Sequence, residues 1–144
     1  MTAPAATLPT VIGRTENALR ALLLKTLAGT PFAGYDAWVA ISVVDRHAAP
    51  DTVDAVSVPL KIGHAEARQL LMSLVACGLL DSDDDGQSWT VSARGAKHLG
   101  AARSRVAAAT ARLAAGLPEA DINAALRVLD HVQTRAEQEL RERP

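Results

Sequence analysis

An acidic run, Asp81-x-Asp83-x-Asp85-Gly86, is the most chemically distinctive stretch of the sequence. Its spacing matches the first half of a calcium loop, where carboxylates at positions 1, 3 and 5 precede a glycine at position 6. Position 12 of such a loop holds a bidentate glutamate, but Ser92 stands there in this sequence. A strand is also predicted where a calcium loop would continue into a helix. We therefore interpret the run as a solvated turn and expect no metal site.

The other reactive side chains have no spacing typical of catalysis or metal binding. The four histidines fall in different predicted elements, without the i,i+4 pair of a helical zinc site, and they are His47, His64, His98 and His131. The sequence contains no nucleophile motif and no glycine-rich phosphate loop. We expect no catalytic residue, no cofactor and no enzymatic activity. The single cysteine, Cys77, follows an apolar run and is predicted to be a buried structural thiol.

The composition favours a mostly helical protein. Apolar residues make up 49% of the 144 residues but aromatic residues only 3%, so alanine, leucine and valine must build the core. Alanine favours helices and lets them approach closely. No stretch approaches the length of a membrane-spanning helix, and the first ten residues do not resemble a signal peptide. We expect a cytoplasmic protein without a membrane partner.

The net charge of −1 conceals an acidic middle third. Residues 51–95 contain seven acidic side chains against Lys61, Arg68 and Arg94, so this segment alone carries a charge of −4. The segments before and after it are both slightly basic. Any polyanionic partner would therefore meet a negative field in this part of the chain.

Apolar periodicity predicts helices in the first third of the chain. Residues 10–29 form the first, and Gly29 with Pro31 ends it. Its apolar face consists of Ile12, Leu19, Leu23 and Leu27. Residues 34–45 read as a second helix, although their β-branched run leaves a strand possible.

The middle of the chain predicts two more helices and a hairpin. Asp51 or Thr52 can cap a short helix that Pro59 should truncate. A fourth helix runs roughly from Gly63 to Cys77. Its apolar stripe is Ala67, Leu70, Leu71, Leu74 and Val75, with Gly78 as the C-terminal cap. Two short strands flank the acidic turn, and Ser92 can cap the helix that follows.

The last fifty residues predict a long helical hairpin, in which Gly116 stops one helix and Pro118 starts the next. Each helix has an apolar seam with alternating steps of three and four. The seams are Leu99, Ala102, Val106, Ala109 and Leu113, and then Ile122, Leu126, Leu129, Ala136 and Leu140. Because a chain this small has little core in which to bury both seams, we predict a homodimer.

This order of elements is that of a winged helix-turn-helix, mostly α with a small two-stranded β-wing. With "AWVAISVV", "LLMSLVACGLLD", "WTVSARGAKHL" and "LAAGLPEADINAALRVLDHVQ" in that order, the chain resembles the MarR family of transcriptional regulators over nearly its whole length. The resemblance implies a homodimer with intertwined terminal helices and a recognition helix in the major groove of a palindromic operator. It also implies a flexible tail over 1–8, helical dimerisation regions over 9–30 and 93–143, and a winged helix-turn-helix domain over 31–92.

By this resemblance the DNA-binding candidates lie on and beside the recognition helix. They are Lys61, His64, Ala65, Arg68, Gln69, Ser73 and Arg94. Arg68 suits a bidentate contact with guanine, and Gln69 suits adenine or a phosphate, whereas Glu66 could accept from cytosine but repels phosphates. The alternative is a solvated helix face with Arg68 paired to Glu66 or Asp54. Family wings usually carry an arginine in the turn, and this turn has none.

Family members are often released from DNA by small aromatic or phenolic ligands, bound between the dimerisation helices and the winged-helix domain. By resemblance Arg14, Tyr35 and Trp38 lie near the gap between the first two helices. Arg14 could hold a carboxylate and Trp38 could form an apolar wall. The alternatives are a surface salt bridge for Arg14 and an ordinary core position for Trp38.

Two functional interpretations follow. The first is a dimeric MarR-like DNA-binding regulator that responds to a small ligand. The second is a protein of the same fold with weakened or lost DNA binding, which binds, sequesters or processes a small molecule or binds a protein partner. A titration with double-stranded DNA distinguishes them.

Overall fold

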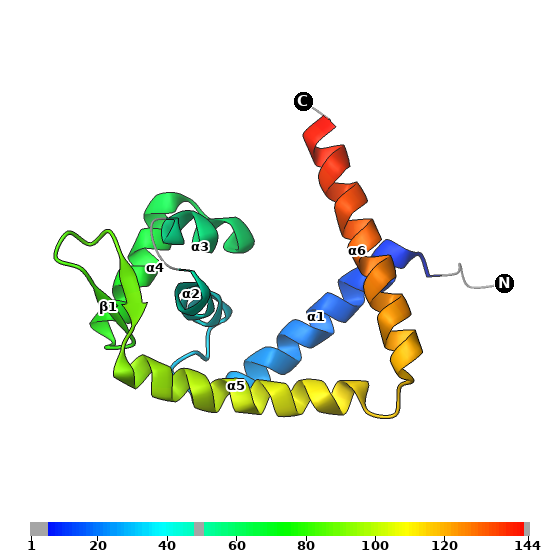
Figure 1. Cartoon of the computed structure of the whole chain (residues 1–144), viewed down its shortest axis with the longest axis horizontal. Coiled ribbons are helices and arrows are strands. Elements are labelled where there is room, and N and C mark those ends of the chain that lie inside the picture. The colour runs from blue at the N-terminus through cyan, green and yellow to red at the C-terminus, as the bar shows by residue number, and fades with distance from the viewer. Residues whose placement is uncertain (1–5, 48–50, 143–144) are drawn as a thin grey trace. The chain divides into compact units, whose positions relative to one another are not determined.

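The structure, a computed structural model, describes residues 6–47 and 51–142 (Figure 1). Residues 1–5, which form most of the predicted tail, lie outside the described part, as do residues 48–50 and 143–144. The helices are α1 (Leu8–Leu27), α2 (Tyr35–Arg46), α3 (Thr52–Leu60), α4 (His64–Ala76), α5 (Ala93–Ala114) and α6 (Glu119–Glu142). The strands are β1 (Leu80–Ser82) and β2 (Trp89–Val91). The predicted fold class, mostly α with a two-stranded wing, is confirmed.

The chain divides into two compact units, Met1–Ala107 and Ala108–Pro144, with the boundary inside α5. The finer predicted division, with a winged domain over 31–92 between dimerisation regions, stays a prediction. None of the helices formed by the described residues is long and apolar enough to cross a membrane.

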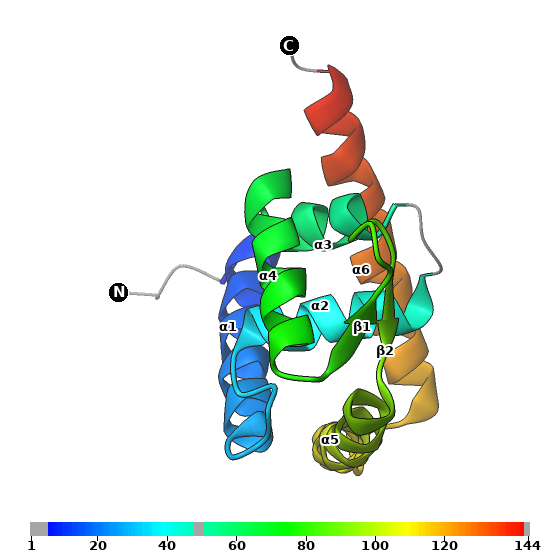
Figure 2. The ribbon, with the colours of Figure 1, turned by 90° about the vertical axis from the view of Figure 1, so that its left-hand side faces the viewer.

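In the first unit, α2, α3 and α4 pack against one another, and the hairpin packs on α4 and α2. Figure 2 shows α4 lying across α2 with the hairpin beside it. The β-branched stretch that left a strand possible is helical. Ala40, Ile41 and Val44 of α2 are buried in the core in helical spacing, so packing outweighs the weaker helix propensity of the branched residues.

Two helix ends differ slightly from their predicted positions. Helix α1 begins at Leu8, with proline in its first turn, where the missing N–H costs nothing. Helix α3 includes Pro59 in its last turn and ends one residue later, at Leu60. The helix is therefore short, as predicted, but the proline is part of it. Lys61 follows in the left-handed region, with φ 54°, and the Ile62 amide donates to the Ser57 carbonyl at 3.2 Å.

The apolar stripe of α4 faces the core as predicted, but Cys77 does not. The chain leaves the helix at Cys77 and reverses at Gly78, whose φ is +73°. Leu79 and Leu80 then enter the core, and the thiol is left exposed. The prediction of a buried thiol was therefore wrong, because α4 ends at Ala76 and the turn at Gly78 brings Leu79 and Leu80, and not Cys77, into the core.

The wing is a short antiparallel hairpin with a buried and an exposed face. Leu80 pairs with Val91, Asp81 with Thr90 and Ser82 with Trp89. Leu80 and Trp89 point to the core and Asp81 and Thr90 to solvent, which is the alternation a half-buried sheet requires.

The second unit contains the end of α5, a turn and α6. The turn includes Gly116 at φ +82°, and the Pro118 carbonyl accepts the Ile122 amide at 3.2 Å, so the predicted stop and start are confirmed. No side chain of α6 is buried. Its seam residues Leu126, Leu129 and Leu140 are 60%, 44% and 78% exposed.

A close approach between α5 and Leu79, the residue before β1, makes Gly95 sensitive to substitution. A Cβ at Gly95 would overlap the Leu79 carbonyl oxygen, whereas a Cβ at Gly100 on the same helix would meet nothing within 4 Å. We expect Gly95→Ala to lower the free energy of unfolding by about 1–3 kcal/mol. Gly100→Ala should raise it by about 0.5–1 kcal/mol. Urea denaturation at one protein concentration measures both, and equal stability of the two variants would contradict the close approach.

Candidate nucleic-acid interface

Helix α4 has a core face and a solvent face, and the sequence-predicted candidates lie on the latter. Ala67, Leu71 and Leu74 are buried. The exposed candidates on this helix are His64, Ala65, Arg68, Gln69 and Ser73. A helix-turn-helix contacts DNA through such an exposed face on its second helix. The structure therefore brings these five residues together on one helix, and their contacts decide what each can do.

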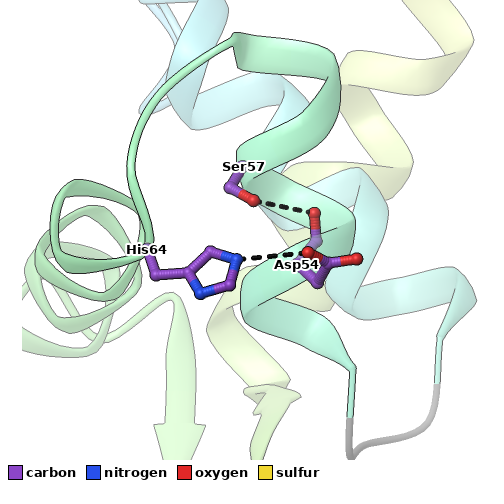
Figure 3. A network of polar contacts seen from close by, with 3 residues as sticks. All are labelled: Asp54, Ser57 and His64. Atoms are coloured by element: carbon purple, nitrogen blue, oxygen red, sulfur yellow. Dashed lines mark hydrogen bonds and ion pairs between the residues drawn. The ribbon is translucent and has the colours of Figure 1, made fainter. Parts of the chain in front are cut away.

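His64 connects the start of α4 to α3. Its Nε2 lies 3.1 Å from Oδ1 of Asp54, and the Ser57 hydroxyl donates to the Asp54 carbonyl oxygen at 3.0 Å (Figure 3). The His64 and Asp54 side chains are 70% and 66% exposed, so the pair contributes little to stability. It orients the imidazole toward α3. Sequence reasoning missed this pair because the two residues are ten apart and meet only through the turn between the helices.

Arg68 contacts the wing. Its Nη1 donates to the Gly86 carbonyl oxygen at 3.0 Å, and its guanidinium carbon lies 5.5 Å from the centre of the Trp89 ring. These contacts differ from the pairing with Glu66 or Asp54 that was the alternative from sequence. The side chain that best suits guanine is thus already bound to the hairpin within the described part of the chain.

The other candidates have different surroundings. Arg94 Nη1 donates to the Cys77 carbonyl at 2.8 Å and so caps the C-terminal end of α4. Ser73 donates to the Leu70 carbonyl at 2.7 Å within its own helix. Lys61 is exposed at the end of α3. Arg94, which belongs to α5, therefore lies at the C-terminal end of α4, away from His64 and Ala65 at the N-terminal end. Its hydrogen bond joins the two helices.

Asp83 organises the acidic turn through its carboxylate. Its Oδ1 accepts the Gln87 amide at 2.7 Å and the Ser88 amide at 3.1 Å, and its own amide donates to the Ser88 carbonyl at 3.1 Å. The Ser88 and Gln87 amides favour the charged form and lower the pKa of Asp83 below 3.8. Among residues 6–47 and 51–142, no three His, Cys, Asp or Glu side chains are grouped to hold a metal ion.

The lowered pKa gives the turn a defined acid dependence. At pH values above 3.8, the ordinary pKa of an aspartate in the unfolded chain, the Asp83 carboxylate is charged and stabilises the turn. This stabilisation is lost as the pH falls through the lower pKa of Asp83 in the folded protein. We expect the amide proton signals of Gln87 and Ser88 to titrate with a midpoint below pH 3.8, as measured by NMR. Asp83→Asn keeps an acceptor oxygen and should abolish the titration. A midpoint at or above 3.8 in the unaltered protein would contradict the hydrogen bonding.

The candidate ligand residues lie around α1 and α2. The Arg20 guanidinium carbon is 4.5 Å from the centre of the Tyr35 ring, and Arg20 also pairs with Glu16 at 2.6 Å. Trp38 is half-buried and packs on Phe32, with 6.2 Å between ring centres. Arg14 is exposed six residues before Arg20, which is roughly 9 Å along the helix.

The cation placed on Tyr35 is therefore Arg20, which sequence reasoning did not select. The i,i+4 spacing of Glu16 and Arg20 indicates their ion pair within α1, but the sequence holds no signal for the contact of Arg20 with Tyr35 of α2. Whether Arg14, Tyr35 and Trp38 hold a ligand stays a prediction.

An open depression of about 600 Å³ lies between the end of α2 and strand β2. Its lining is Val44, Asp45, His47, Ser88, Trp89, Thr90 and Val91. Arg103 pairs with Asp45 at 2.7 Å, and the indole nitrogen of Trp89 is buried without a hydrogen-bond partner. The depression includes none of the three residues predicted to hold a ligand.

Comparison with known proteins defines the fold. No protein-family model and no curated protein matches the sequence. Solved structures match over most of the chain. A MarR family protein from Bacillus stearothermophilus shares 13% identity, with a TM-score of 0.74 over 90% of this chain and 93% of that one.

Two similar structures contain ligands. CouR from Rhodococcus jostii RHA1, bound to p-coumaroyl-CoA, shares 17% identity, with a TM-score of 0.73 over 90% of this chain and 95% of that one. A MarR family protein from Mycobacterium tuberculosis, in complex with salicylic acid, shares 19% identity, with a TM-score of 0.65 over 89% of this chain and 99% of that one.

The described elements define a winged helix-turn-helix protein. More narrowly, its fold is that of the MarR family regulators, and the resemblance seen in the sequence is confirmed at the level of the fold.

Proposed function

We propose that the chain is a MarR-like, DNA-binding transcriptional regulator that acts as a homodimer. The observation that carries this proposal is the exposed face of α4 in a winged helix-turn-helix whose other face is buried in the core. A major groove about 12 Å wide admits one helix. The MarR family regulators with this fold support the same assignment.

The residues proposed to read bases are Ala65, Gln69 and Ser73. They are spaced by four and so form one stripe along the exposed side of α4. Ala65 suits the methyl group of thymine, Gln69 suits the edge of adenine, and Ser73 suits either a base or a phosphate. Lys61 and His64 stand before and at the start of the helix, where phosphate contacts position a protein on the duplex.

Dimerisation is proposed to involve α6. Ile122, Leu126, Leu129, Ala136 and Leu140 follow the a/d spacing of a helix that packs on another helix. None of these side chains is buried. A second copy of the chain would cover this apolar seam, and two recognition helices would then match the two halves of a palindromic operator.

Replacing Leu126 and Leu129 with aspartate should convert the dimer to a monomer, because two charges would have to be buried at the centre of the seam. Val58→Asp is the matched control, since Val58 is 67% exposed but belongs to α3 in the first unit. Sedimentation equilibrium measures the mass of each variant, and circular dichroism its helix content. A helical monomer at micromolar concentration for the unaltered protein would refute the dimer.

A small aromatic or phenolic effector is also proposed. The support comes from the fold, since similar proteins were solved with p-coumaroyl-CoA and with salicylic acid. Tyr35 and Trp38 offer aromatic surface in α2, and Arg14 and Arg20 offer guanidinium groups in α1. An effector with a carboxylate and an aromatic ring fits these side chains best.

One observation favours a second candidate function. The wing turn carries Asp83, Asp84 and Asp85, and these residues are exposed. A phosphate close to this turn would be repelled, because exposed charges act over a Debye length of about 8–10 Å at ordinary salt. A protein of this fold that binds a small molecule or a protein partner, with weakened DNA binding, would have no such conflict.

A titration of duplex DNA from upstream of the gene, at two salt concentrations, separates the two candidates. Asp84→Asn with Asp85→Asn should raise affinity about two- to fivefold at low salt, since each charge pair at 10 Å in water is worth about 0.4 kcal/mol. The gain should shrink at high salt. Gln69→Ala should cost about 1–3 kcal/mol for the cognate site and relax the preference at one base pair.

Fluorescence polarisation measures these affinities. If neither the unaltered protein nor the asparagine variant binds any duplex at low salt, the second candidate replaces the first. Asp83 is left unchanged in this experiment because its carboxylate orders the turn.

A further inference from the structure

We propose that Arg68 is a positioning residue that locks the acidic wing turn to the recognition helix. The contact belongs to the free chain, while its consequence for operator binding rests on the function proposed above. Arg68 would then influence DNA recognition through the wing and would not itself read a base.

Arg68 lies on the exposed side of α4, yet its guanidinium reaches across to the hairpin. Its Nη1 donates to the Gly86 carbonyl at 3.0 Å in the turn, and its guanidinium carbon lies 5.5 Å from the centre of the Trp89 ring. Trp89 is the first residue of β2 after the turn and pairs with Ser82. One side chain therefore joins α4 to the turn and to the end of β2 that follows it.

The two ends of this contact differ in rigidity. Trp89 is only 3% exposed and belongs to the core, so its ring is a rigid platform on which a guanidinium can stack. Gly86 lies in the turn beyond the paired strands, with φ +61°. Strands of three residues, joined by such a turn, make a hairpin that is marginal without further contacts. Arg68 supplies one from a rigid helix.

The acceptor of the hydrogen bond is uncharged. Arg68 donates to a backbone carbonyl and not to a carboxylate, so the contact does not require the charge of Asp84 or Asp85. Removing those charges should therefore leave the lock intact. The positive charge beside the tip also reduces the local negative field of the turn.

A bidentate contact with guanine needs two donors of the guanidinium on one base edge. Only one of the five N–H donors is used on Gly86, so the number of donors does not prevent this contact. Its direction does, because the Gly86 carbonyl and the Trp89 ring together hold the guanidinium toward the hairpin. Loss of Arg68 should then misplace the wing on every DNA sequence alike and should not relax the preference at one base pair.

The lock is tested first without DNA. The sequence has two tryptophans, Trp38 and Trp89, so Trp38→Phe leaves Trp89 as the single reporter. In this background Arg68→Ala should increase acrylamide quenching of Trp89. It should also raise hydrogen exchange at the Gln87 and Ser88 amides roughly tenfold, because a charged hydrogen bond to the turn is lost.

Two matched controls accompany this test. Gln69→Ala removes the neighbouring exposed side chain of α4, and Asp84→Asn with Asp85→Asn removes charge from the turn. Both should leave quenching and exchange as in the parent. Equal quenching and exchange in Arg68→Ala and Gln69→Ala, with helix content unchanged, would overturn the lock.

The consequence is tested on the cognate duplex and on duplexes with single base-pair changes. Arg68→Ala should weaken binding to all of them by the same factor. A loss confined to one base pair would overturn the positioning role and make Arg68 a base-reading residue. If the unaltered protein binds no duplex, the proposed function fails, whereas the fluorescence and exchange result still decides the lock.

Discussion

The hydroxyl of Ser92 joins the three elements on which the first unit depends. It donates to the Gly78 carbonyl at 2.6 Å and accepts the Gly95 amide at 2.9 Å, so it connects the end of α4 to the start of α5. The Ser92 amide donates to the Leu79 carbonyl at 3.1 Å, next to the first strand. Because Gly95 has no Cβ, α5 can approach Leu79 closely enough for these bonds to form together. This one buried side chain therefore ties together the end of α4, the root of the wing and the start of α5.

The local part of this structure could be predicted from the sequence. The apolar stripe of α4, the left-handed Gly78 and the cap by Ser92 depend on residues within one turn of each other, and such signals are visible in a single sequence. The contacts of the site could not. His64 meets Asp54, Arg68 meets Gly86 and Arg20 meets Tyr35 only after separate elements have packed. Exposed polar side chains choose among several partners, and periodicity does not distinguish those partners.

The acidity of the wing has a partial structural explanation. Asp83 has a structural role, because its carboxylate accepts the Gln87 and Ser88 amides and so orders the turn. Asp84 and Asp85 have no comparable role in the turn, and they keep it highly charged. Exposed acidic side chains also protect a short hairpin from pairing with another strand. The cost falls on any contact with phosphate, so the turn is better suited to solvent than to a minor groove.

The same charge balance would limit the proposed binding of DNA. Residues 51–95 contain three cations, and two of them, Arg68 and Arg94, donate to backbone carbonyls of this segment. The free energy gained by releasing counterions scales with the number of phosphates neutralised, so these residues would contribute little of it. Specific binding would have to come from neutral contacts such as those of Gln69, and from two recognition helices acting together on one operator. In a dimer the second contact is intramolecular, which raises the overall affinity without any new cation. The first unit, residues 1–107, has equal numbers of acidic and basic side chains, and the seam of α6 is exposed. If the chain binds an operator as proposed, both features favour binding as a dimer, because a monomer would have few cations with which to hold the duplex.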